Sequence, residues 1–353
     1  MKLLTLLETG RIKMTRGAHM EYVLGIDQGG SKTHAVVADL EGRILGMGKS
    51  YGACHSSSSL EYALKAILEA FEDALGSCQL SLEDVTTVVG GLTGIDWDYE
   101  VALLESGIQK YFPKAQIKVV NDSIIAMRAA TREKRCGILC AGSGLNCAVQ
   151  SGDACFAYGF YIPDEYQGGW SLGKMAVQAV FDSHMGLLPE TALTQRLLTH
   201  FQAETVDELL FMRVKGKITS DDYLKLPMII EEEACGGDEV AAGIWKNYGK
   251  VIAGYLTARA RKMGICGEKM DIVLSGSIFK CKFQEFQAKV KEEILRVIPG
   301  ANVIEAVFEP VMGAVVMGLQ IVYGEIPEEI YKNMEETSNK FPIRRLTCNI
   351  GKH

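Results

Sequence analysis

A turn near the start of the chain carries residue types that bind phosphate. It follows an apolar segment that ends at Asp27, and it reads QGGSKT from Gln28 to Thr33. Glycine lets the backbone approach a phosphate closely, and the N–H groups of a turn can converge on an anion. Asp27 is placed to hold Mg²⁺ through water, as phosphoryl transfer requires, although an ordinary hairpin with a glycine turn has the same pattern. The predicted phosphate contacts are Gly29, Gly30, Ser31, Lys32 and Thr33.

A second segment repeats this plan. It runs from Gly137 to Gly159 and contains an apolar strand, a Gly-Ser-Gly turn, another strand, a further turn and a third strand. Internal repetition is a fold-level signal that arises by chance less easily than a single motif. Two such turns that face each other across a cleft would hold one polyphosphate from both sides. We therefore predict phosphate contacts at Gly142, Ser143 and Gly144, with Asn146 either bonding locally or supporting this loop.

An aspartate stands where a strand-like segment gives way to a helical one. Asp122 follows Lys118 to Val120 and opens the segment from Ser123 to Ala130. Aspartate is a good helix N-cap, which is one role for this side chain. Ligands of open α/β sheets sit at the carboxyl ends of strands, so the other role is a general base toward a substrate hydroxyl, with Asn121 orienting it.

The elements that must position these residues alternate between strand and helix. Such alternation implies parallel crossovers and an α/β fold. The second half of the chain repeats the plan of the first, with a helical insertion at about residues 187–228. The expected strands include 22–27, 34–39, 87–91, 117–120, 271–275 and 302–305, and the expected helices include 60–75 and 99–112.

The order of these motifs resembles the sugar kinase/Hsp70/actin superfold and, within it, the BadF/BadG-type ATPase family, which includes N-acetylglucosamine kinases. The resemblance extends from Met20 to about residue 325. The sequences that match family motifs are GIDQGGSKT and AGSGLNC for the two phosphate motifs, VVNDSIIAMRAA for the catalytic aspartate, EEEACGGDEVA for a helix start at Gly237-Asp238, IVLSGSIFK for adenosine, and PVMGAVVMGL for the closing helix.

This resemblance implies two duplicated ribonuclease H-like (actin-like ATPase) domains, with ATP in the cleft between them and Mg²⁺ as the metal. The expected domains are residues 21–121 and 122–353. The resemblance assigns the catalytic base to Asp122 and adenosine contacts to Gly276 and Ser277.

The acceptor side departs from the family pattern. The family's kinases carry Asn-His in the loop after the third strand, where this chain has Cys54-His55. Cysteine is a weak hydrogen-bond partner and does not replace an amide in reading sugar hydroxyls. A tryptophan of the pattern becomes Tyr158, and a Gly-Ser pair becomes Tyr-Gln. The acceptor contacts implied are Cys54, His55, Asp122, Tyr158, Asp164 and Glu165, but N-acetylglucosamine itself is placed in doubt.

Composition excludes several other classes of protein. The chain has 353 residues, 48% hydrophobic and 23% charged, with a net charge of −7. This balance is typical of a globular protein, and it argues against nucleic-acid binding because no basic cluster stands out. No apolar run reaches membrane-spanning length. The ten cysteines lack framework spacing, so we expect mostly buried thiols in the cytoplasm. Residues 1–20 differ from the rest, and we interpret them as a disordered tail or a mis-assigned start before Met20.

The sequence therefore favours an ATP- and Mg²⁺-dependent kinase acting on a hydroxyl of a sugar or amino sugar. One alternative is the ATPase activator of a radical dehydratase, although no suitable cysteine pair follows the second phosphate turn to hold an iron–sulfur cluster. Another is a non-catalytic sugar or nucleotide sensor. The acceptor and the oligomeric state stay open, with a homodimer as one option.

Overall fold

Two sheets of the same design form the framework of the protein. The computed structural model describes residues 21–343, and each sheet in it has five strands, in the orders β3-β2-β1-β4-β5 and β10-β9-β6-β7-β8. In each sheet three consecutive strands form an antiparallel meander. A fourth strand pairs in parallel with the first strand of the meander, and a fifth pairs in parallel with the fourth. The strands are β1 (Tyr22–Gln28), β2 (Lys32–Asp39), β3 (Ile44–Tyr51), β4 (Val85–Leu92), β5 (Gln116–Asn121), β6 (Arg135–Ala141), β7 (Leu145–Ser151), β8 (Ala154–Ala157), β9 (Met270–Ser275) and β10 (Ala301–Glu305).

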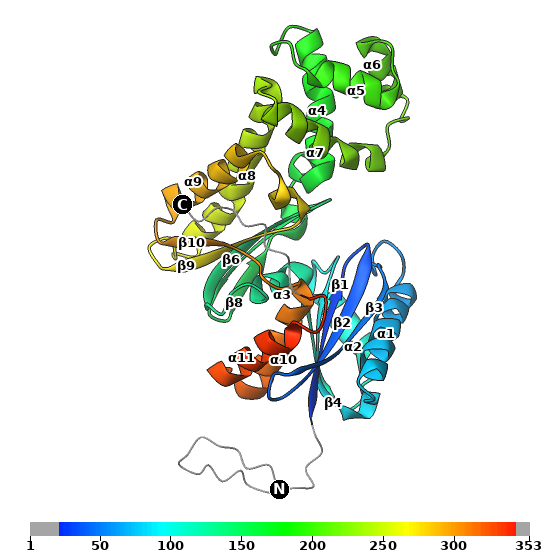
Figure 1. The fold of residues 1–353 in the computed structure, drawn as a ribbon, viewed down its shortest axis with the longest axis vertical. Helices are drawn as coiled ribbons and strands as arrows, with labels where there is room; N and C mark the ends of the chain where they lie inside the picture. Colours follow the sequence, from blue (N-terminus) through cyan, green and yellow to red (C-terminus); the bar gives the residue numbers. More distant parts are fainter. Residues whose placement is uncertain (1–20, 344–353) are drawn as a thin grey trace, which may run out of the picture.

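Helices connect and cover these strands, so the predicted α/β fold with a duplicated sheet is confirmed (Figure 1). The 3₁₀ turns are η1 (Leu82–Asp84), η2 (Gly159–Tyr161), η3 (Asp164–Tyr166) and η4 (Ser277–Lys280). The α-helices are α1 (Leu60–Ser77), α2 (Asp98–Gln109), α3 (Asp122–Arg128), α4 (Gly168–His184), α5 (Leu193–Phe201), α6 (Val206–Val214), α7 (Ser220–Cys235), α8 (Glu239–Lys262), α9 (Gln284–Val297), α10 (Pro310–Tyr323) and α11 (Glu328–Ser338).

The helix α1 shows how local sequence produces these elements. The Ser59 side chain caps its first turn by accepting from the N–H of Tyr62. Its apolar residues recur at helical spacing and face the first sheet. Phe71 meets Phe112 edge to face at 4.9 Å between ring centroids, which locks the helix onto the core.

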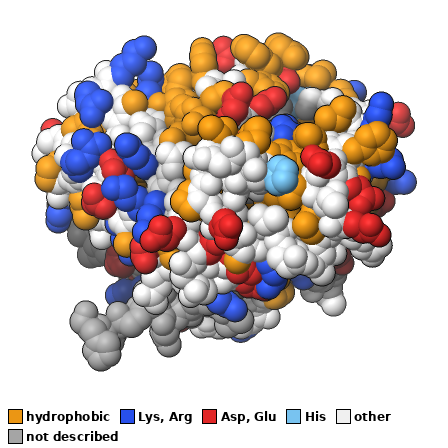
Figure 2. Space-filling view, turned by 90° about the horizontal axis from the view of Figure 1, so that it is seen from above, with side chains coloured by type: hydrophobic (Ala, Val, Ile, Leu, Met, Phe, Trp, Pro, Cys, Tyr) orange, Lys and Arg blue, Asp and Glu red, His pale blue; other side chains and the backbone are white. Residues whose placement is uncertain are grey.

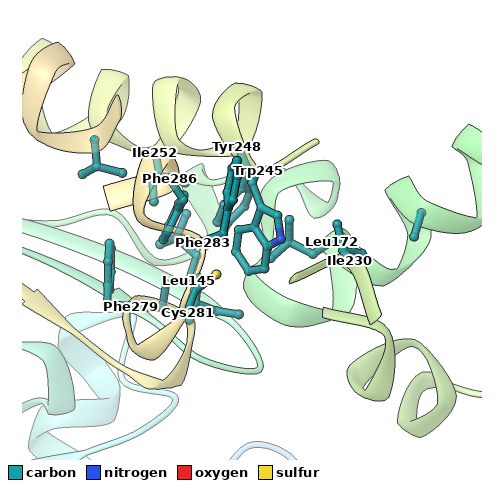
Figure 3. Packing of buried hydrophobic residues seen from close by; sticks show 14 of the residues in the cluster. Leu145, Leu172, Ile230, Trp245, Tyr248, Ile252, Phe279, Cys281, Phe283 and Phe286 are labelled. Carbon is teal, nitrogen blue, oxygen red and sulfur yellow. The ribbon is translucent and has the colours of Figure 1, made fainter. Parts of the chain in front are cut away.

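A second aromatic core lies beneath the second sheet. Trp245 and Tyr248 of α8 pack against Phe286 of α9, and Figure 3 shows these rings together. The Trp245 and Phe286 ring centroids are 4.9 Å apart. All three side chains are among the largest fully buried ones of the described region, so α8 and α9 are fixed in position.

The closing helices pack on the first sheet, which corrects the predicted domain boundary. We expected residues 122–353 to form the second domain, but α10 lies against β1, β4 and α3, and α11 lies against β3 (Figure 1). Close packing requires glycine here, because a Cβ on Gly313 would lie 1.8 Å from the carbonyl oxygen of Ile125. The first domain is therefore discontinuous in sequence.

The helical insertion is confirmed and forms the outer end of the second domain. α5, α6 and most of α7 lie within the predicted range. The predicted helix start at Gly237-Asp238 is also confirmed, because the Asp238 carboxylate caps α8 by accepting from Ala241 N–H at 2.8 Å. Figure 2 looks onto this end of the molecule and shows apolar side chains at its surface, where Phe211 and Val214 of α6 are exposed.

No helix within residues 21–343 is both long enough and apolar enough to cross a membrane. The prediction for residues 1–20 lies outside the described residues.

Candidate active site

The first predicted phosphate turn joins β1 to β2. A hydrogen bond from Gly29 N–H to the Lys32 carbonyl, 2.9 Å long, closes this turn. Gly30 and Ser31 are exposed, which leaves their backbone N–H groups accessible to a ligand. The Lys32 ammonium lies 3.4 Å from Glu309, the N-cap residue of α10, so this turn also contacts the closing helix.

One member of this turn faces inward. Thr33 is fully buried, and its hydroxyl donates to the Tyr51 carbonyl at 2.7 Å. Successive residues of a strand alternate between the two faces of a sheet, so Lys32 and Thr33 point in opposite directions. The hydroxyl has a structural partner, and we leave Thr33 out of the proposed phosphate contacts.

The second predicted turn joins β6 to β7 and supports the start of α4. Gly142 N–H donates to the Gly144 carbonyl at 2.8 Å, and Gly169 N–H donates back to the Gly142 carbonyl at 2.8 Å. Gly168 has φ +58°, and a Cβ there would lie 2.4 Å from the Gly144 oxygen. The first N–H groups of α4 therefore hold the second turn in place, since Trp170 N–H also donates to the Ser143 carbonyl at 3.3 Å, and the positive end of the helix dipole lies beside the turn.

A cavity of about 280 Å³ opens beside this second turn. It brings together Gly142 and Ser143 with Ser277 of the predicted adenosine motif, which the sequence places far apart. The remaining wall comes from α4, α7, α8 and the η4 region; Glu231, Ile278 and Lys280 lie within quoted family motifs, but none of the wall residues was predicted individually. They are Gly169, Leu224, Pro227, Met228, Glu231, Trp245, Ile278, Lys280 and Cys281.

Asp122 opens α3 at the carboxyl end of β5, but it is not the cap. Asn121 is the N-cap residue, and its side chain accepts from Ser123 N–H at 3.0 Å. The alternative role of Asp122 as N-cap is therefore wrong. Burial raises the pKa of the Asp122 carboxyl, bonds from Ser123 N–H and the Thr93 hydroxyl act against this, and the charge of Asp96 raises it further.

Hydrogen bonds link Asp122 and its neighbour Asn121 to the residues that flank the two glycine turns. Thr93, which contacts the Asp122 carboxyl, donates its N–H to the carbonyl of Gln28 at 2.9 Å, next to the first turn. On the other side, the Asn146 amide donates to the Asn121 side chain at 3.0 Å. Asn146 also accepts from Gly159 N–H at 3.2 Å, so the structure places its side chain at the domain junction. Its predicted ATP contact stays a prediction.

The expected acceptor residues of the first domain contact Thr93 and Glu100. The Cys54 thiol lies 3.7 Å from the carbonyl oxygen of Thr93, and Thr93 is the residue whose hydroxyl bonds the Asp122 carboxyl. His55 Nε2 lies 3.3 Å from Glu100 Oε1, and both side chains are 7% exposed. Burial acts to raise the pKa of Glu100, but N–H groups of the Asp96–Trp97 segment and the imidazole outweigh it, so that pKa lies below its ordinary value.

The expected acceptor residues of the second domain come from the loop after β8. A Cβ on Gly159 would lie 2.0 Å from Asp96 Oδ1, so this loop touches the first domain. The Tyr158 hydroxyl donates to the Tyr255 carbonyl at 2.6 Å, and burial raises its pKa to about 12. Asp164 and Glu165 are exposed at the start of η3. Tyr158 therefore holds the loop in position through its hydrogen bond, while the two carboxylates are accessible to a ligand.

Asp27 fits the expected role toward a metal. It stands near the end of β1, paired in register with Gly91 of β4, and is 9% exposed. Magnesium in phosphoryl-transfer sites is commonly held by one or two carboxylates together with substrate phosphates and water. A single carboxylate at a strand end next to a phosphate turn matches that chemistry.

Comparison with known proteins agrees with this geometry. The profile of the BadF/BadG/BcrA/BcrD ATPase family matches residues 24–318. The chain belongs to this family. Similar proteins of known name include an N-acetylmuramic acid/N-acetylglucosamine kinase from Clostridium acetobutylicum, 25% identical over 73% of this chain and 86% of the relative. A glucosamine kinase from Vibrio cholerae is 26% identical over 72% of this chain and 88% of the relative.

Solved structures show the same fold. A proposed N-acetylglucosamine kinase from Chromobacterium violaceum has a TM-score of 0.63 at 18% identity, covering 86% of this chain and all (100%) of the other. A ROK-family glucokinase from Streptomyces griseus, solved with glucose and AMPPNP, has a TM-score of 0.53 at 19% identity, covering 85% and 99%. Among BadF/BadG/BcrA/BcrD ATPases, this chain thus shares the two-domain architecture of sugar kinases.

Proposed function

We propose that this protein is an ATP-dependent kinase that phosphorylates a hydroxyl of a sugar or amino sugar. The observation that carries the proposal is the position of Asp122. It is a carboxylate with a raised pKa at the carboxyl end of β5; Thr93 links it to Gln28 beside the first glycine turn, and its neighbour Asn121 accepts from Asn146, which follows the second turn. A general base there can reach an acceptor hydroxyl, while the turns hold the phosphates.

Each domain would contribute one of the two phosphate-binding turns. The exposed Gly30 and Ser31, on a turn closed by Gly29, would contact the phosphates from the first domain, and the Gly142–Gly144 turn from the second. Bound Mg²⁺ would neutralise phosphate charge, held through water by Asp27. Asp122 takes the proton of the acceptor hydroxyl as the new bond from oxygen to the γ-phosphorus forms and the bond to ADP breaks.

The surroundings of Asp122 suit a carbohydrate. Asp164 and Glu165 offer exposed carboxylates to sugar hydroxyls, and the side chains that flank the Asp96–Gly159 contact are aromatic. Trp97 is 55% exposed and Phe160 is 77% exposed. Pyranose rings present an apolar C–H face that packs on aromatic rings, and exposed aromatic surface commonly marks a binding site. The named kinases among the relatives act on amino sugars, which supports this acceptor class.

The setting is proposed to be the cytoplasm. The nine cysteines within residues 21–343 are free thiols, which suits a reducing compartment that also supplies ATP.

A coupled ADP-release assay tests the proposal. The purified protein is given ATP and Mg²⁺ with hexoses, amino sugars and N-acetylated amino sugars in turn, and the phosphorylated product is identified by mass spectrometry. ADP release that depends on one of these sugars and is lost in Asp122→Asn supports the kinase. A sugar-independent ATPase rate across the whole panel contradicts it.

A further inference from the structure

A buried carboxylate lies next to the Cys54-His55 loop and takes no part in the proposed phosphoryl transfer. Glu100, in the first turn of α2, is buried. Its Oε2 accepts from the N–H groups of Asp96 and Trp97 at 2.8 and 3.0 Å, which caps the helix. Capping uses only this oxygen, so the other oxygen of the carboxylate is available for a second role.

That other oxygen, Oε1, faces the imidazole of His55. It lies 3.3 Å from Nε2, and the Tyr99 hydroxyl reaches it at 3.4 Å. Nε2 is one of the few buried side-chain atoms within residues 21–343 that lack a well-aligned hydrogen bond, so the carboxylate of Glu100 is the acceptor that this nitrogen faces. His55 Nδ1 is not among those buried atoms, which leaves it as the ring nitrogen that a ligand can meet.

The same carboxylate holds the loop that lies beside Asp122. This loop, residues 93–97, bonds the Asp122 carboxyl through the Thr93 hydroxyl at one end. At the other end it is fixed by the two N–H groups that the carboxylate accepts from. An added Cβ on Gly94 would lie 3.8 Å from His55 Cε1, so the imidazole packs along the loop. The carboxylate thus joins His55 to the segment that contacts the proposed general base.

The chemistry of imidazole determines which nitrogen donates. In a neutral ring one nitrogen carries the hydrogen and the other offers a lone pair, and the partner of one nitrogen decides the state of the other. A carboxylate only accepts, so Nε2 carries the hydrogen and Nδ1 offers the lone pair. We propose that Glu100 is a positioning residue for the sugar, which orients His55 so that Nδ1 accepts a hydrogen bond from a sugar hydroxyl. The inference rests on the proposed function, because it needs a sugar beside Asp122.

The tautomer of His55 tests this in the protein without ligand. Long-range proton–nitrogen NMR correlations at mildly alkaline pH, where imidazole is neutral, distinguish the two nitrogens, and His55→Gln identifies the signals of this residue. The wild type should carry the hydrogen on Nε2. In Glu100→Gln the carboxamide oxygen can keep the helix cap, while the amide donates toward Nε2 and should move the hydrogen to Nδ1. A wild-type His55 with its hydrogen on Nδ1 would overturn the inference.

Kinetics show whether this orientation matters to the sugar. In the coupled ADP-release assay, Glu100→Gln should raise the KM of the sugar at least about tenfold and change kcat less than about threefold, because one hydrogen bond to the substrate is lost. ATP affinity by calorimetry should stay unchanged. In a His55→Ala background the same substitution should change the sugar KM by less than about twofold, since it acts through that ring.

Glu105→Gln is the matched control. Glu105 also lies on α2 and accepts from Val119 N–H at 3.0 Å, and its variant should keep the wild-type KM. An unchanged sugar KM in Glu100→Gln overturns the inference and leaves the kinase proposal standing. An equal loss in the His55→Ala background also overturns it, because Glu100 would then act only through the fold. A wild type with the Nε2 tautomer but no sugar-dependent ADP release removes the kinase proposal, and this role of Glu100 with it.

Discussion

Replacing Asp122 by asparagine should abolish most of the turnover while making the fold more stable. Asparagine keeps the size of the side chain but cannot take a proton. General-base catalysis contributes roughly 10²–10⁴-fold, which corresponds to about 2.7–5.4 kcal/mol of barrier at about 1.36 kcal/mol per tenfold. ATP affinity should stay near that of the wild type, because Asp122 is not among the residues that line the cavity beside the second glycine turn.

The gain in stability follows from the direction of the pKa shift. Burial, together with the charge of Asp96, places the pKa of Asp122 above its ordinary value in the folded protein. The contribution of such a group to stability is fully present below its unfolded pKa and is lost as pH rises through the raised folded pKa. At neutral pH the ionised carboxylate therefore destabilises the fold relative to a neutral side chain of the same shape, and Asp122→Asn should raise the melting temperature.

Three measurements on one preparation decide this. Coupled ADP release gives kcat, calorimetry gives ATP affinity, and thermal unfolding at neutral and acidic pH gives stability. The melting-temperature advantage of Asp122→Asn should shrink as pH falls, because the wild-type carboxyl then becomes neutral as well. A variant that keeps most of its turnover removes Asp122 from the mechanism. One that loses stability and ATP binding together shows that the side chain is mainly structural.

Three further predictions concern the surroundings of this site. Asp96→Asn should move the acidic limb of the pH–kcat/KM profile to lower pH, because it removes a charge that raises the pKa of Asp122; an unmoved limb argues against this coupling. Gly142→Val should stay folded, because the nearest other atom lies 3.7 Å from an added Cβ, but calorimetry should show ATP binding at least about tenfold weaker. Gly168→Ala should instead lower the melting temperature, because its Cβ would lie 2.4 Å from the Gly144 carbonyl oxygen. N-acetylglucosamine should not give the highest kcat/KM among screened sugars, because Cys54 replaces an amide and each lost buried hydrogen bond costs roughly 1–3 kcal/mol. Cys54→Asn should raise the kcat/KM for N-acetylglucosamine relative to the other sugars. If the wild type has its highest kcat/KM with N-acetylglucosamine, the reasoning is refuted.

The parts of the site that were predictable from the sequence are those made by contiguous residues. Each glycine turn is joined to two strands by adjacent residues, so QGGSKT and AGSG indicate its position directly. The inward direction of Thr33 was not predictable from alternation, because residues 33–38 of β2 are all buried and burial does not distinguish its two faces.

The cavity beside the second glycine turn could not be found in the same way. Its wall combines Gly169, Glu231, Trp245 and Lys280, which come from four separate segments and meet only through tertiary packing. Trp245 in particular reads as an ordinary core residue of an amphipathic helix. The position of α10 is a second example, because an apolar helix gives no indication of which sheet it will cover.

The return of α10 to the first sheet also fixes the order in which the protein can be completed during synthesis. One face of that sheet, including Val23, Val36 and Ala38, is covered by residues of α10 and of the segment after it. A ribosome releases these residues only after the whole second sheet has been made. The N-terminal strands must wait, with an apolar face open, through the translation of more than half of the chain. Expressing residues 21–121 alone would therefore leave this face permanently uncovered, and chaperone dependence should be greatest before α10 emerges.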